Sequence, residues 1–134
     1  MTPGITVTVA VPADPGCLDA LAEGLVRLNM TQLEHARAAG VATPSIYACG
    51  ARYRREHGGE RWQSVAEMMQ SRPPSGDCED LAAWRVAELR RAGEEASVRI
   101  VRTSRGTFHA VVRYSDGTIE DPSRILHAAE RRQK

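Results

Sequence analysis

Aromatic residues and lysine are scarce in this chain of 134 residues. Aromatic residues make up 4% of the chain and apolar residues 42%, so aliphatic side chains and alanine must form the core. Lysine occurs only at Lys134, and arginine balances the acidic residues to a formal net charge of +1. This balance provides no strongly basic surface for nucleic acid or for an anionic membrane. We therefore expect neither as a partner.

Long apolar runs and paired cysteines are also missing. No apolar segment approaches the ~18 residues that a membrane span needs, and residues 1–5 lack the features of a signal peptide. These absences predict a cytoplasmic protein. The three cysteines, Cys17, Cys49 and Cys78, include no CxxC pair, so we expect neither a disulfide framework nor a thiolate zinc site.

The order of predicted elements is helices first and then an antiparallel meander, which is typical of the α+β class. Size favours one domain over residues 1–134, with its functional core at about 60–125. The hydrophobic patterns and the glycine and proline breaks predict strands at 5–11, 98–102, 107–114 and 118–121, and helices at 17–39, 61–70, 78–93 and from 123 onward.

Cys78 lies where a loop becomes a helix. Residues 71–76 contain Pro73, Pro74 and Gly76 and cannot be helical throughout, whereas residues 80–89 are good helix formers. Free N–H groups and the dipole at a helix N-terminus favour a thiolate. The alternative is a small buried residue on a core face, because helical spacing aligns Cys78 with Ala82, Val86 and Leu89. Cys17 and Cys49 are expected to be small buried residues of this kind.

His109 lies in a predicted strand. Alternation places Phe108, Ala110 and Val112 on one face, which is the better core face, and His109 on the other. A lone strand histidine is usually structural, so its role depends on what lies beside it. The remaining histidines lie in polar contexts that predict surface positions.

Asp121 reaches the face of His109 only if the turn at residues 115–117 has an odd length. A two-residue Asp-Gly loop would place Asp121 opposite Val112, away from the histidine. A three-residue loop with left-handed Gly117 places it diagonal to His109 on the same face. Asp116 and Glu120 are the competing carboxylates, but the first fits turn chemistry and the second points to the other face.

Three segments together resemble the transglutaminase-like, papain-related superfamily of cysteine enzymes: Gly76-Asp77-Cys78-Glu79-Asp80-Leu81-Ala82, then Phe108-His109-Ala110-Val111, then Asp121-Pro122-Ser123. The first is closest in form to bacterial transglutaminase-like cysteine proteinases. The resemblance implies a nucleophile helix packed on a small antiparallel sheet, with Cys78, His109 and Asp121 as nucleophile, base and orienting residue.

The resemblance also implies a thioester acyl-enzyme and no cofactor. Resolution by water gives a peptidase or amidase acting on a peptide or protein, which we expect, whereas transamidation and deamidation are alternatives. The Cys78 N–H would contribute to the oxyanion hole, with Tyr53, Trp62 or Gln63 as unranked side-chain donors. Acyl transfer to an arylamine ranks last, because those enzymes need a longer chain.

The chain departs from the family in ways that keep other interpretations open. The spacings between Cys78, His109 and Asp121 are short for the family, so substrate preference cannot be inherited. Periplasmic relatives use calcium near the cysteine, but the two carboxylates of Asp77 and Asp80 are too few for it, and capping explains them better. We expect no metal. Compact versions are encoded among bacteriophage structural genes, so the rival hypothesis is a virion or assembly protein whose polar tail at 128–134 binds a protein partner.

Overall fold

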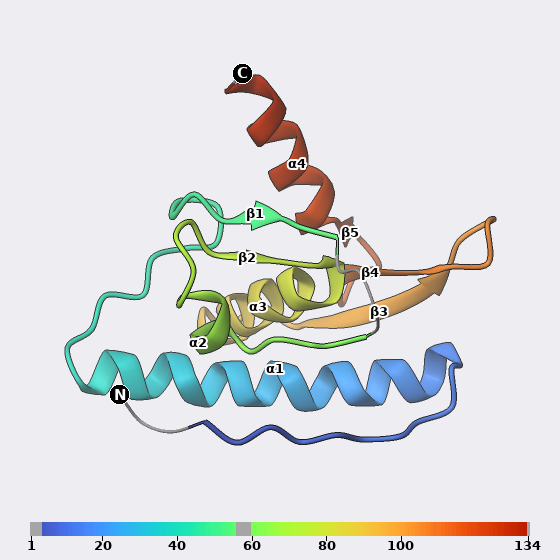
Figure 1. Cartoon of the computed structure of the whole chain (residues 1–134), viewed down its shortest axis with the longest axis horizontal. Coiled ribbons are helices and arrows are strands. Elements are labelled where there is room, and N and C mark those ends of the chain that lie inside the picture. The colour runs from blue at the N-terminus through green and yellow to red at the C-terminus, as the bar shows by residue number, and fades with distance from the viewer. Residues whose placement is uncertain (1–3, 56–59, 134) are drawn as a thin grey trace.

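The computed structural model describes residues 4–55 and 60–133 and has the expected α+β architecture (Figure 1). A two-stranded parallel sheet pairs β1 with β2, and a three-stranded antiparallel sheet has the order β3-β4-β5. In chain order the elements are α1 (Pro15–Ala38), β1 (Arg52–Tyr53), α2 (Val65–Met68), β2 (Ser75–Gly76), α3 (Cys78–Arg91), β3 (Ala96–Arg102), β4 (Phe108–Tyr114), β5 (Ile119–Glu120) and α4 (Pro122–Arg132).

Helix α3 is the centre of the molecule, because both of its faces are buried. The face predicted from helical spacing packs against α1 and the antiparallel sheet, and it carries Cys78, Ala82, Val86 and Leu89. The opposite face carries Leu81, Trp84 and Ala87 and packs into a second apolar cluster. A helix that is buried on both faces fixes the position of its first residue firmly.

The antiparallel sheet confirms the predicted odd-length turn. The Tyr114 N–H donates to the carbonyl oxygen of Thr118 at 2.9 Å, and the register continues to Val112 opposite Glu120. Gly117 has a φ of +89°, the left-handed conformation that this three-residue loop requires. Asp121 therefore follows β5 on the face of His109.

Helix α1 runs along one side of α3, and polar contacts link the two (Figure 1). The Arg90 guanidinium donates to both carboxylate oxygens of Glu23, at 2.6 and 2.7 Å. The buried Asn29 side chain accepts the Val65 N–H at 2.8 Å, which attaches α1 to the start of α2. These contacts hold the segment that precedes β2 against the core.

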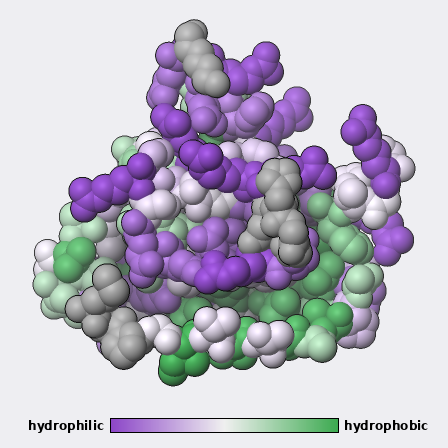
Figure 2. Space-filling view, viewed as in Figure 1, coloured by the Kyte–Doolittle hydropathy of each residue, from purple (hydrophilic) through white to green (hydrophobic). Residues whose placement is uncertain are grey.

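The predicted strand at residues 5–11 is wrong. This segment lies extended beside α1 without a partner strand, and Ile5 and Val7 are 91% and 75% exposed (Figure 1). Figure 2 shows hydrophobic atoms along the same edge. A β-branched run predicts extended backbone, but a strand also needs a neighbour to complete its hydrogen bonds. Within the described residues none pairs with it.

Two further expectations also need correction. The helix predicted at 61–70 is only Val65–Met68, because Ser64 caps it and extended backbone precedes it. Cys17 and Cys49, expected to be buried, are partly exposed. A search of the described residues finds no helix with the length and apolar character to cross a membrane.

Candidate active site

The turn from β2 into α3 is held by a buried carboxylate. Asp80 is fully buried and accepts the Asp77 N–H at 3.0 Å and the Gln63 N–H at 2.8 Å, which completes a capping box. Gly76 is required by close packing, since an added Cβ would lie 2.7 Å from the Met68 sulfur and 2.8 Å from the Asp80 Cβ. Cys78 follows as the first residue of α3.

The Cys78 thiol is buried among apolar side chains, at 9% exposure. Its Sγ donates to Glu79 Oε2 at 3.1 Å. Burial and the Glu79 carboxylate raise the pKa of this thiol well above its ordinary value, although a hydrogen bond from the Ala110 N–H acts in the opposite direction. Burial and the Glu79 carboxylate therefore act against the thiolate that the helix N-terminus is expected to favour.

Glu79 is a feature that sequence reasoning missed. Its side chain is 6% exposed, and its Oε1 has no hydrogen-bond partner among the described residues. Burial and the nearby Asp77 carboxylate raise the pKa of Glu79 to about 8, despite the hydrogen bond from Cys78. A glutamate in the first turn of a helix ordinarily suggests an exposed residue that complements the dipole. Nothing in the local sequence shows that this one points into the core.

His109 and Asp121 meet as the turn geometry predicts. His109 Nε2 lies 2.7 Å from Asp121 Oδ2. Asp121 is also the N-cap of α4, and its Oδ1 accepts from the Ser123 hydroxyl at 2.8 Å and the Arg124 N–H at 3.3 Å. The cap fixes the carboxylate, which orients the imidazole through Nε2; among the described residues no hydrogen bond is made by Nδ1.

The structure joins two of the three predicted residues directly. Among the residues that it describes, no hydrogen bond connects the Cys78 thiol to His109; the sulfur contacts the backbone N–H of the next residue, Ala110. Cys78 thus lies beside the strand that carries the histidine, with its S–H directed to Glu79 instead.

A second carboxylate, Glu120, is fully engaged on the opposite face of the sheet from His109, as predicted. It accepts from Arg85 Nε at 2.7 Å, from the Tyr114 hydroxyl at 2.5 Å and from the Tyr47 hydroxyl. Burial raises the pKa of Glu120, but these donors outweigh burial and lower it overall. Arg85 belongs to α3, so this network connects the helix that begins at Cys78 to the residue that precedes Asp121.

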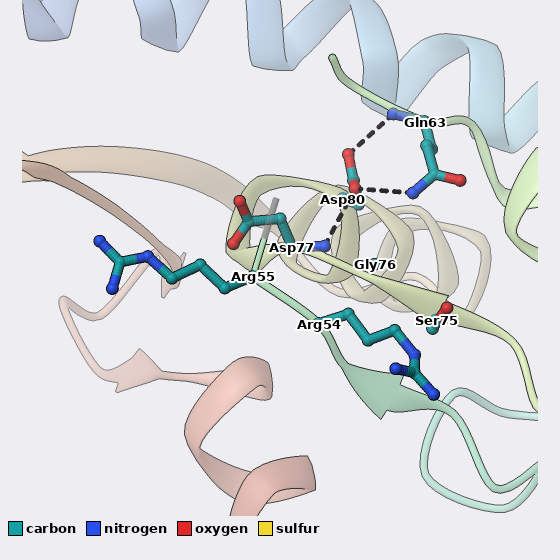
Figure 3. Close-up of a pocket in the computed structure, with 7 residues that line it drawn as sticks. All are labelled: Arg54, Arg55, Gln63, Ser75, Gly76, Asp77 and Asp80. Carbon is teal, nitrogen blue, oxygen red and sulfur yellow. Dashed lines mark hydrogen bonds between the residues drawn. The ribbon is translucent and has the colours of Figure 1, made fainter. Parts of the chain in front are cut away.

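A polar pocket of about 190 Å³ opens beside the turn that precedes Cys78, and its lining includes both arginines (Arg54 and Arg55) and carboxylates (Asp77 and Asp80). Figure 3 shows Gln63 bonded to Asp80 on one side, and the Arg54 and Arg55 side chains extending in different directions on the other. Tyr53 lies nearby, because it pairs with Gly76 across β1 and β2. Burial, and then the charges of Asp77, Cys78 and Glu79, raise the pKa of its phenol.

Three side chains around the thiol could contact a metal ion. Asp77, Cys78 and Glu79 offer ligand atoms that all lie within 4.8 Å of one another. Two carboxylates and one sulfur do not fit calcium, which takes six to eight oxygens. Asp77 also caps α3 by accepting the Cys78 N–H at 2.8 Å, as expected from its position. The donor set therefore gives no support to a calcium site.

Comparison with known proteins finds no matching family model, no matching curated protein and no matching solved structure.

Proposed function

We propose that this protein is a cysteine hydrolase, a peptidase or amidase of the transglutaminase-like type. The observation that carries the proposal is the 2.7 Å contact between His109 and Asp121, the N-cap residue of α4. His109 lies in β4, and the N–H of the following residue, Ala110, contacts the Cys78 sulfur. A histidine oriented by a carboxylate beside a cysteine on a helix N-terminus has the composition of a thiol catalytic triad.

The mechanism requires the Cys78 side chain to turn from Glu79 toward His109 Nδ1. His109 then takes the thiol proton, and Asp121 stabilises the imidazolium. The thiolate attacks an amide carbonyl, and a C–S bond forms. The imidazolium protonates the departing amine as the C–N bond breaks, leaving a thioester. Water, deprotonated by His109, attacks the thioester, and the carboxylic acid and the free thiol are released.

The proposed oxyanion donor is the Tyr53 hydroxyl. Trp62 Nε1 donates to Glu60, while the backbone N–H and the amide of Gln63 both donate to Asp80. The Cys78 N–H, expected to serve the oxyanion, donates to Asp77 in this structure. Tyr53 pairs with Gly76 across β1 and β2, and the charges around Cys78 act on its phenol. A Tyr53→Phe variant should lose about tenfold in kcat/KM with little change in KM.

The substrate proposed for the polar pocket is a peptide with acidic side chains. In the described part of the chain, no acidic side chain pairs with Arg54 or Arg55, whereas neighbouring Arg52 pairs with Glu130. Arginine recognises carboxylates through its planar fork of donors. Cleavage rates of two fluorogenic peptides, which differ only by Glu or Gln at one position, test this. The preference for the Glu peptide should fall in Arg54→Gln and Arg55→Gln, and it should persist in Arg105→Gln, the control for lost charge.

The decisive test is iodoacetamide labelling across pH with peptide mapping. Cys17 and Cys49 provide the internal reference, because both are partly exposed. A hydrolase predicts that Cys78 labels faster than either near neutral pH despite its burial, and that His109→Ala removes the advantage. Equal labelling in wild type and His109→Ala would reject the proposal.

The second candidate is an assembly protein that keeps the fold without the chemistry. The observation in its favour is the exposed aliphatic segment at residues 5–11, together with the raised pKa of the Cys78 thiol. Transamidation and deamidation remain alternatives within the enzyme class, and analysis of products with and without an added amine separates them from peptide hydrolysis.

A further inference from the structure

Glu79 is the one group in the first turn of α3 whose position serves no evident structural purpose. The flanking carboxylates act as caps: Asp77 accepts the Cys78 N–H at 2.8 Å and Asp80 accepts the Asp77 N–H at 3.0 Å. Glu79 instead places one oxygen 3.1 Å from the Cys78 sulfur and leaves the other buried without a partner within the described residues. A buried oxygen without a partner costs free energy, so it suggests a functional role.

The contact controls where the thiol points. A thiol has a single hydrogen, so an S–H that donates to Glu79 does not at the same time donate to His109. The Ala110 N–H near the sulfur shows that the histidine strand is adjacent. His109 lies on the other face of this strand from Ala110, so contact with it requires the thiol to turn away from Glu79.

We propose that Glu79 is a positioning residue, which holds the Cys78 thiol away from His109 while its carboxylate is charged and releases the thiol when that charge is lost. The proposal rests on the proposed function, because it assigns His109 as the acceptor after release. It adds control of the Cys78 orientation by the charge of Glu79, which Cys78, His109 and Asp121 do not provide by themselves.

The groups that face Glu79 determine the direction of the switch. From α3 and its cap come Asp77, Cys78 and Asp80, and from β1 comes the Tyr53 phenol. The carboxylates repel a charge on Glu79, and burial acts in the same direction, so both favour the protonated, released form. The Arg55 charge acts on the Tyr53 phenol and lowers its pKa.

The test is a double-mutant cycle on Cys78 alkylation, using Glu79→Gln and His109→Ala, from pH 6 to pH 9. Glutamine preserves shape and removes the charge. We expect Glu79→Gln to match wild type at pH 6 and to react about tenfold faster at pH 9, where the wild-type carboxylate is charged. In the His109→Ala background this gain should shrink to less than threefold, because the released thiol has no acceptor.

Two outcomes would overturn the proposal: equal pH profiles for Glu79→Gln and wild type, or a gain of the same size with and without His109. Glu79→Asp is the conservative control, because its shorter carboxylate should weaken the hold only in part. The exposed Glu94→Gln matches the lost charge and should change nothing. If His109→Ala leaves the wild-type rate unchanged while Glu79→Gln still raises it at pH 9, the hydrolase proposal fails, and the charge effect of Glu79 is measured separately.

Discussion

Two glutamates, Glu79 in α3 and Glu120 bonded to it through Arg85, lie in opposite electrostatic environments. Glu120 receives three donors, one of them the Arg85 guanidinium, and its pKa is lowered. Glu79 accepts the weak S–H donor of Cys78 and a hydrogen bond from its own backbone N–H, has one oxygen without a partner in the described chain, and its pKa is raised to about 8. A satisfied network stabilises and positions a scaffold, whereas an under-satisfied ionisable group suggests a functional site. We therefore assign Glu120 to the scaffold, and Glu79 is the residue that we propose positions the Cys78 thiol.

Removal of the scaffold carboxylate should have the largest effect on stability. Glu120→Ala removes the acceptor of Arg85 Nε and of two tyrosine hydroxyls, and leaves the half-buried Arg85 with Glu88 alone, so the free energy of unfolding should fall by about 3 kcal/mol. Urea denaturation measures this. Glu130→Ala, which removes the more exposed ion pair with Arg52, is the matched control and should cost less than about 1 kcal/mol. Equal losses of unfolding free energy in both variants would show that the Glu120 network stabilises the fold no more than a surface ion pair does.

The pH dependence of stability should show the opposite behaviour of Glu79. Its pKa is about 4.5 in an unfolded chain and about 8 in the folded protein, so the folded state binds more protons between these values. Stability therefore falls as pH rises from about 4.5 through 8. Relative to Glu79→Gln, the wild type should lose roughly 2 kcal/mol between pH 6.5 and pH 8.5. A constant difference between the two proteins across this range would contradict the raised pKa.

The close packing of Gly76 against Met68 and Asp80 fixes the start of α3, and its removal should have a smaller effect on stability than the changes at the two glutamates. Gly76→Ala places a methyl group 2.8 Å from the Asp80 Cβ, so the capping box must shift, at a cost of about 1 to 2 kcal/mol in the free energy of unfolding. The same variant should slow Cys78 alkylation, because the turn positions that residue. Ser75→Ala, one residue earlier, controls for the substitution and should preserve both properties.

The sequence predicted those parts of the fold and site that depend on local rules. Helical spacing gave the buried face of α3, and strand parity with the chemistry of Gly117 gave the contact between His109 and Asp121. The strand at residues 5–11 failed, because β-propensity cannot supply a partner. The burial of Glu79 and the acceptors of Glu120 were out of reach, because they depend on which elements pack together rather than on neighbouring residues.

The smallest effect should come from the turn that aligns Asp121 with His109. Gly117 has a φ of +89° and open space around its Cα, so Gly117→Ala costs only the left-handed backbone, about 1 kcal/mol. The control is Gly24→Ala in α1, which also has open space but helical backbone, and it should stabilise the protein by up to about 1 kcal/mol. Thermal denaturation should therefore shift in opposite directions for the two substitutions. If both shift the same way, the left-handed turn does not set the register, and the sequence argument that paired His109 with Asp121 loses its basis.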